Sequence, residues 1–182
     1  MMGESMAPGA AAVTLNEARG WLRMGTTLDD AVVAQLIRAA TNICEAFIGR
    51  WLVIREVEEE VGLEAGRARL RIRPVVAVDA VATIDDDGEE TALAADGWRL
   101  ATKDDGTGWV APVESGAATR LRVGYRAGLA SGPNDIPEAI RQGIVRLVQH
   151  LHEARDDADR APPAVVAALW QPWRRVGLGG AQ

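Results

Sequence analysis

The acidic run DDDGEE, residues 85–90, is the first stretch whose side chains could bind a ligand. Its carboxylates come from Asp85, Asp86, Asp87, Glu89 and Glu90. Such oxygens bind calcium, but an EF-hand loop needs a glycine at its sixth position and a glutamate at its twelfth. Counted from Asp85, the glycine is fourth and the twelfth residue is Asp96. The run therefore fails as an EF-hand and is typical of a solvated hairpin turn.

Two histidines and one cysteine are further candidate metal ligands. His150 and His152 stand two apart on a predicted helix, so they point to different faces and form a poor metal pair. Cys44 lies in an apolar pattern typical of a small core residue, and it cannot form an intrachain disulfide. The sequence lacks G-x-S-x-G and Walker motifs, and nothing marks a pair of carboxylates as desolvated. We therefore expect no metal, no cofactor and no catalytic residues.

The stretch LWQPWRRV, residues 169–176, carries the side chains of the chain that are best suited to binding another protein. Its candidate binding residues are Trp170, Pro172, Trp173, Arg174, Arg175 and Val176. One interpretation is that the two tryptophans fold back onto the protein's own core, as aromatic residues most often do. The other is that the stretch docks on another chain, because Trp and Arg are enriched at interface hot spots. The prolines would stiffen this arm and lower the cost of ordering it.

Composition and charge exclude several classes of protein. The chain has 182 residues, 48% of them apolar, which suits one domain with a real hydrophobic core. Its net charge is −6, whereas general nucleic-acid-binding proteins are more often basic. No run approaches the roughly 20 apolar residues of a membrane span, and the N-terminus has no basic region like that of a signal peptide. The single cysteine fits a reducing compartment.

The acidic residues are concentrated in one part of the chain. Between Asp79 and Glu114 there are ten acidic residues, and only Arg99 and Lys103 oppose them. We therefore expect one acidic module within an otherwise nearly neutral protein.

Apolar periodicity predicts helices over residues 15–24, 28–51 and 137–155, and a short one from 163 to about 169. Thr14 is the expected N-cap of the first helix, with Glu17 at the capping-box spacing, and Gly25 is its expected end. The second helix has the widest apolar face. Its stripe is Leu28, Val32, Leu36, Ala40, Ile43, Phe47 and Trp51, with Val33, Ile37, Cys44 and Ile48 beside it.

Between the second and third helices the period changes to two, which predicts strands. We expect residues 52–126 to form an antiparallel module of five or six short strands, with tight turns at each Asp-Gly pair. The run 52–61 carries several acids on one face, and the run 68–74 carries arginines. We expect these two runs to pair across a hairpin with opposite charges adjacent.

The predicted fold class is α+β: a helical bundle with an inserted small antiparallel β module and an extended C-terminal arm. Residues 1–13 form a flexible N-terminus, 14–160 the main domain, and 161–182 the arm.

In this order the elements resemble the head–tail connector (adaptor) proteins of long-tailed phages and gene transfer agents. The resemblance runs from about Thr14 to Leu178. The pieces that carry it are TLNEARGWLRM, DDAVVAQLIRAATNICEAFIGRWL, IDDDGEE in the hairpin region, VGYRAGLA, IPEAIRQGIVRLVQHLHEAR and PPAVVAALWQPWRRV. The ending PWRRV is most similar to the gene-transfer-agent branch. The late helix of the family often carries a tyrosine where this chain has His150 or His152.

The resemblance implies a structural role and no enzymatic activity. Adaptor subunits form a ring of twelve below the portal protein, in the neck of a virion or gene-transfer-agent particle made in the bacterial cytoplasm. The ring extends a channel through which DNA passes without sequence-specific binding, and it meets the next neck or tail protein, a stopper. The family's C-terminal segment reaches the portal protein, which gives residues 170–176 the role of a docking arm.

The acidic run has two interpretations in such a ring. Asp85, Asp86, Asp87, Glu89 and Glu90 could face the channel or the tail, where carboxylates would repel DNA phosphates. They could equally serve only solubility. Two alternatives for the whole protein also stay open: another neck component, such as a stopper or tail-completion protein, and a small enzyme domain with a pocket of converging polar groups.

Overall fold

The computed structural model of the protein describes residues 5–6, 11–25, 29–114, 116–153 and 163–174. The chain divides into two compact units. Residues 1–9 and 54–129 form the β unit, and residues 10–53 and 130–182 form the helical unit. The β unit is therefore inserted into the sequence of the helical unit, and the predicted α+β class is confirmed.

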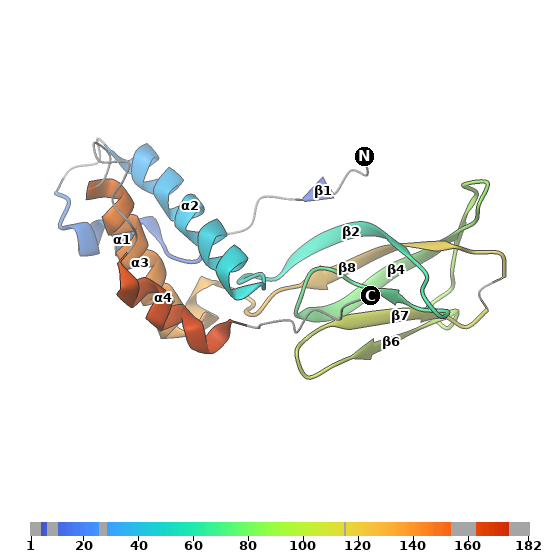
Figure 1. Cartoon of the computed structure of the whole chain (residues 1–182). Coiled ribbons are helices and arrows are strands. Elements are labelled where there is room, and N and C mark those ends of the chain that lie inside the picture. The colour runs from blue at the N-terminus through green and yellow to red at the C-terminus, as the bar shows by residue number, and fades with distance from the viewer. Residues whose placement is uncertain (1–4, 7–10, 26–28, 115, 154–162, 175–182) are drawn as a thin grey trace. The chain divides into compact units, whose positions relative to one another are not determined.

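The helical unit contains four α-helices, which Figure 1 shows as coiled ribbons. They are α1 (Leu15–Leu22), α2 (Asp30–Ile48), α3 (Glu138–Glu153) and α4 (Ala164–Trp170). Two short 3-10 helices, η1 (Pro133–Asp135) and η2 (Gln171–Trp173), precede α3 and follow α4. Each predicted helix is present, with ends shifted by a few residues.

The ends of the first two helices follow local chemistry. The Oγ1 of Thr14 accepts a hydrogen bond from the backbone N–H of Glu17 at 3.2 Å, which confirms the predicted N-cap. The Glu17 side chain is not used in a capping box, because its Oε2 accepts a hydrogen bond from Arg141 of α3 at 2.6 Å. Helix α1 ends before the predicted Gly25, since Arg23 adopts a left-handed conformation with φ of 55°. Gly49 closes α2 in the same way.

The core of the helical unit lies where α2 packs against α3. The buried side of α2 carries Val33, Ile37, Ala40, Cys44 and Ile48. The buried side of α3 carries Ile140, Ile144, Leu147 and Val148. The predicted main stripe of α2 is therefore displaced around the helix, and Ile43, which belonged to it, is 47% exposed.

Helix α2 is also apolar and long enough to cross a membrane, with 19 residues and a mean hydropathy of 1.4. The expectation that no run approaches the length of a membrane span is therefore corrected for α2. Core helices of globular domains meet the same criterion, and the buried side of α2 packs against α3.

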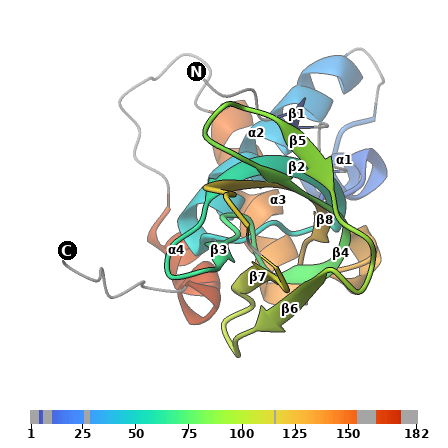
Figure 2. The same ribbon diagram turned by 90° about the vertical axis from the view of Figure 1, so that its right-hand side faces the viewer.

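The β unit contains two antiparallel sheets. The five-stranded sheet has the order β1 (Ser5–Met6), β2 (Arg55–Gly62), β8 (Arg120–Ala127), β4 (Val75–Ile84) and β5 (Glu90–Ala92). The three-stranded sheet has the order β3 (Ala68–Arg69), β7 (Gly108–Pro112) and β6 (Trp98–Thr102). Figure 2 shows the two sheets facing each other, with contacts between β2 and β3 and between β4 and β6 at the seams. The module thus has more strands than predicted.

The core of the β unit contains a buried carboxylate among apolar side chains. Glu59 is 3% exposed, and its Oε1 accepts hydrogen bonds from the Tyr125 hydroxyl at 2.7 Å and from the backbone N–H of Arg71 at 2.9 Å. The Tyr125 hydroxyl in turn accepts a hydrogen bond from the backbone N–H of Ile72 at 3.1 Å. This network holds the irregular segment that follows β3 against the strands β2 and β8.

The prediction that residues 52–61 and 68–74 pair as the two strands of a hairpin is wrong. A tight turn does occur, because Glu64 and Arg67 exchange backbone hydrogen bonds around Ala65 and Gly66, both with positive φ. Beyond it the chain separates, and β2 pairs with β1 and β8 whereas β3 pairs with β7. One predicted charge pair between the two runs is nevertheless present, because Arg71 lies 3.9 Å from Glu59 of β2. The neighbouring acid of β2, Glu60, pairs with arginines of β8.

The predicted flexible N-terminus also needs correction at two places. Ser5–Met6 pairs with β2 as strand β1. Ala12 and Val13 are buried, so the folded helical unit begins before the predicted boundary at Thr14.

Replacing Tyr125 by Phe tests the polar network of the β unit. The Tyr125→Phe variant removes the hydroxyl but keeps the ring, so the Ile72 N–H and the buried Glu59 each lose a partner. We expect a loss of about 1–3 kcal/mol in the free energy of unfolding. Urea denaturation followed by circular dichroism measures it, and an unchanged midpoint would show that the network does not stabilise the fold.

Candidate functional site

Trp170, predicted as a docking residue, is buried in its own subunit. It is the last residue of α4 and only 2% exposed. Its indole Nε1 donates a hydrogen bond to the backbone carbonyl of Ile140 in α3 at 3.2 Å. Its ring lies 5.8 Å from the ring of Phe47 in α2, tilted by 53°. Of the two interpretations of this tryptophan, the packing one is correct, and Trp170 anchors α4 to α2 and α3.

Gly143 leaves the space in α3 that the Trp170 indole occupies, called the seat of Trp170 below. A Cβ at position 143 would lie 2.2 Å from the Trp170 Nε1 and 2.8 Å from its Cε2, distances that no side chain tolerates. The glycine therefore leaves a notch in α3 that receives the indole. An isolated glycine inside a helical pattern signals a close approach of this kind, so this part of the seat could have been found from the sequence.

The residues that follow Trp170 are more accessible. Pro172 and Arg174 are exposed, and Trp173 is half-buried. The Arg174 guanidinium carbon lies 5.3 Å from the centre of the Phe47 ring, within the range of a cation–π contact. Arg175 and Val176, also predicted as docking residues, lie outside the described residues. The described part of the arm therefore presents Trp173 and Arg174 next to a buried anchor.

The acidic run forms the turn between β4 and β5, as predicted. The Asp85 Oδ1 accepts a hydrogen bond from the backbone N–H of Glu89 at 2.8 Å, and Gly88 has a φ of 84°. Asp86, Asp87 and Glu89 are exposed. These three residues, called the acidic turn below, make no ion pair within the described part of the chain. Asp85 thus has a structural role, and within the run 85–90 the carboxylates without a hydrogen bond or ion pair among the described residues are those of the acidic turn.

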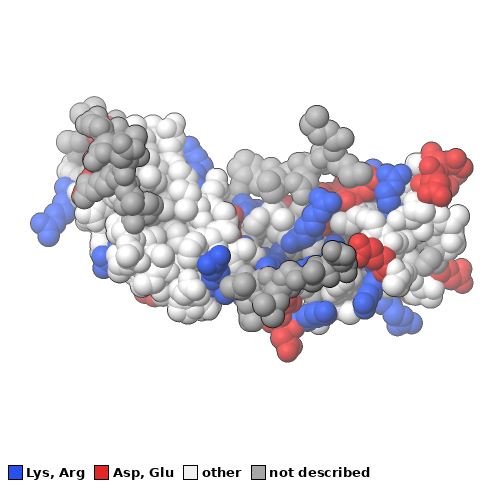
Figure 3. Space-filling model, viewed as in Figure 1, with Lys and Arg blue, Asp and Glu red and all other residues white. Residues whose placement is uncertain are grey.

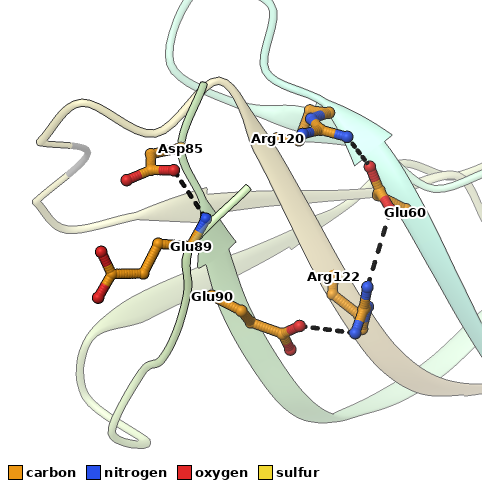
Figure 4. A network of polar contacts seen from close by, with 6 residues as sticks. All are labelled: Glu60, Asp85, Glu89, Glu90, Arg120 and Arg122. Atoms are coloured by element: carbon orange, nitrogen blue, oxygen red, sulfur yellow. Dashed lines mark hydrogen bonds and ion pairs between the residues drawn. The ribbon is translucent and has the colours of Figure 1, made fainter. Parts of the chain in front are cut away.

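Glu90 belongs to an ion-pair network on the outer face of the five-stranded sheet (Figure 4). Arg122 of β8 donates a hydrogen bond to Glu90 at 2.6 Å and lies 3.8 Å from Glu60 of β2. Glu60 also pairs with Arg120. Further along β8, Arg126 holds Asp79 with two hydrogen bonds of 3.1 Å, and this contact raises the pKa of Arg126. The arginines of β8 therefore neutralise acids that the sequence places in the acidic segment and in β2.

The net charge of the protein lies in one unit. The β unit has sixteen acidic and ten basic residues, whereas the helical unit has ten of each. The β unit alone thus accounts for the net charge of −6.

No group of three His, Cys, Asp or Glu side chains among the described residues is arranged to hold a metal ion. Burial raises the pKa of the Cys44 thiol, so this cysteine is protonated and unreactive at neutral pH. An open hollow of about 630 Å³ in the helical unit is lined by Trp21, His152 and Glu153 among others. Glu153 is exposed there and hydrogen-bonded to Gln149 at 2.8 Å, so it is not the desolvated acid that an enzyme would need.

The seat of Trp170 can be tested with a pair of glycine substitutions. Gly143→Ala places a methyl group against the indole, and we expect a loss of about 1–3 kcal/mol in the free energy of unfolding. Gly20→Ala is the matched control, because Gly20 also lies in a helix but has no neighbouring atom within 4 Å of the position that a Cβ would take. There we expect no loss, or a gain of up to about 1 kcal/mol. Thermal denaturation of both variants measures the difference, and equal stability would argue against the notch.

Solved structures similar to this chain come from gene transfer agent (GTA) particles. A chain in the neck of an empty GTA particle, computed with C6 symmetry, is 28% identical with a TM-score of 0.79. A chain in the virion of a native GTA particle is 28% identical with a TM-score of 0.78. One in the neck of a native GTA particle, computed with C12 symmetry, is 27% identical with a TM-score of 0.76. Each alignment covers 100% of this chain and 98% of the other.

No curated protein sequence matches this chain. A family model does match, over residues 11–161, and it describes head completion proteins. This range spans both units apart from the first residues and the C-terminal arm. The chain therefore belongs to the head completion protein family.

Proposed function

We propose that this chain is a subunit of a ring in the neck of a phage or GTA particle. The ring lies below the portal protein, extends the DNA channel and joins the capsid to the tail. The observation that carries the proposal is the similarity over the full chain to subunits of GTA necks, together with the exposed end of an anchored arm. As a head completion protein, the chain is a structural protein and not an enzyme.

The symmetry of the similar assemblies supports a ring. Neck structures that contain similar chains were computed with C6 and C12 symmetry. A ring of twelve copies, which the family resemblance implies, is compatible with both. Repeated contacts around such a ring add up, so each contact between two subunits can be weak.

The arm is the proposed contact with the portal protein. Trp170 fixes the start of the arm, and the residues from Trp173 onward are the binding segment. Trp173 supplies an apolar anchor, and Arg174 and Arg175 can donate paired hydrogen bonds to carboxylates of the portal. Val176 would add apolar contact. The buried Trp170 preorganises this segment and lowers the cost of binding.

The excess of acidic over basic residues in the β unit supports the proposal that DNA passes through the ring without being bound. Basic surfaces hold DNA by releasing counterions from its phosphates, whereas a unit with sixteen acidic and ten basic residues repels phosphates on average. The ring would then meet its next partner, a stopper or another tail-side protein, at the end away from the portal.

Portal binding by the arm can be tested with changes that spare the core. Removal of residues 174–182 keeps Trp170 and its seat, whereas a cut before Trp170 would disturb folding. We expect this truncation, and the Trp173→Ala variant, to weaken binding to the portal protein of the same particle at least tenfold, since hot-spot losses typically exceed about 1.4 kcal/mol. Binding is measured with purified full-length portal.

The matched control is Arg38→Glu, which reverses an exposed arginine on α2 outside the arm. It should bind the portal protein as the parent chain does. Normal portal binding by the truncated chain would refute the docking role of the arm.

A further inference from the structure

The outer face of the three-stranded sheet is basic, although it belongs to the acidic unit. The register places Arg69 of β3 opposite Trp109 of β7, and Trp109 opposite Ala101 of β6. Because side chains alternate along a strand, Arg67 and Arg99 lie on this same face. Lys103 joins them, since its Nζ lies 5.6 Å from the centre of the Trp109 ring. The four cations around Trp109, namely Arg67, Arg69, Arg99 and Lys103, are called the basic face below.

The cations of the basic face have no acidic partner in the described chain. All four are exposed, and none takes part in an ion pair among the described residues. Arg120, Arg122 and Arg126 on the other sheet are all paired with carboxylates. Of the two acids in the nearby turn after β6, Asp105 pairs with Arg73 at 3.5 Å, and the exposed Asp104 makes no ion pair with these cations among the described residues. The basic face is therefore a concentration of unpaired positive charge.

The acidic turn has the opposite charge and lies on another side of the same unit. Figure 2 shows β5 near the top of the β unit and β6 at its lower edge. Figure 3 shows acidic side chains gathered at the upper right, where the turn between β4 and β5 lies, whereas several basic side chains, with acidic ones among them, lie along the lower edge. The fold thus keeps these complementary groups apart within one chain.

We propose that the basic face of one subunit receives the acidic turn of a neighbouring copy in the ring. This inference rests on the proposed function, because it names the surfaces that join adjacent subunits. A ring needs a head-to-tail contact between two different surfaces of the same chain, and these two surfaces differ in place and are opposite in charge. The pairing would satisfy Asp86, Asp87 and Glu89 together with the cations of the basic face. In this proposal the three acids lie between neighbouring subunits, and not at the channel or tail side where they were expected.

A second copy fits the basic face better than DNA does. Proteins that hold single-stranded nucleic acid stack bases on open aromatic rings. The Trp109 ring is instead covered, with the Arg67 guanidinium carbon 4.6 Å from its centre and Lys103 also over it. This arrangement fixes the two cations as donors for carboxylates and leaves the ring unavailable to bases.

Reversal of charge on each surface tests the pairing. The face variant carries Arg67→Glu, Arg99→Glu and Lys103→Glu, and the turn variant carries Asp86→Lys, Asp87→Lys and Glu89→Lys. A third chain combines all six changes. Self-association of each full-length chain is measured by sedimentation velocity over a range of concentrations and by electron microscopy of rings. Controls are Arg38→Glu and Asp96→Lys, which reverse exposed charges outside the two surfaces.

We expect each triple variant to self-associate at least tenfold more weakly than the parent, because like charges then meet across the interface. Mixing the two triple variants, or combining all six changes, should restore association, since opposite charges meet again. Parental association should also weaken at about 1 M salt, where the screening length falls to about 3 Å. Recovery of association in the mixture or in the six-change chain would show that each triple variant lost a contact and had not misfolded.

Two results would overturn the inference while leaving the proposed function intact. One is a parent chain that forms rings while both triple variants form them equally well. The other is an anisotropy titration in which the parent binds short double-stranded DNA, the face variant does not, and the six-change chain fails to recover association. By contrast, a parent chain that forms no ring either alone or with portal protein would contradict the proposed ring itself, whatever the variants do.

Discussion

The seating of Trp170 in the notch at Gly143 is the contact on which the C-terminal part of the protein depends. Helix α4 has seven residues, too few to be stable alone in water. The indole joins α4 to both long helices, through the Ile140 carbonyl in α3 and the Phe47 ring in α2. Because these helices come from chain segments on either side of the β unit, the same contact helps to close the helical unit. It also fixes where the accessible residues Trp173 and Arg174 begin.

Charge is the second organising constraint. The helical unit is neutral, and the β unit carries the net charge of the protein. Within the β unit, one sheet neutralises its charges across neighbouring strands, where Arg120, Arg122 and Arg126 meet carboxylates. The other sheet leaves its cations unpaired, and the turn after β4 leaves its acids unpaired. Exposed pairs within a chain contribute little stability, so the concentration of unpaired cations on one face and of unpaired acids on the acidic turn is better explained by contacts between chains.

Local signals in the sequence predicted the helices, the turn at Asp87-Gly88 and the cap at Thr14, because each depends on neighbouring residues. Strand partners depend on distant residues, so β2 was assigned to the wrong neighbour and the basic face, assembled from three strands, was not foreseen. The sequence also could not show which of the two tryptophans in the arm is buried and which is accessible for binding. Trp170 and Trp173 have the same chemistry and similar surroundings in the sequence, and only the glycine notch in α3 decides that the first is buried.

The most direct measurement is a reconstruction of the neck of the parent particle by electron cryomicroscopy. We predict a ring of this chain directly below the portal, with Trp173 and Arg174 at the portal contact and Trp170 buried within its own subunit. A reconstruction in which another protein separates this chain from the portal, or in which the arm points away from it, would contradict the proposed role.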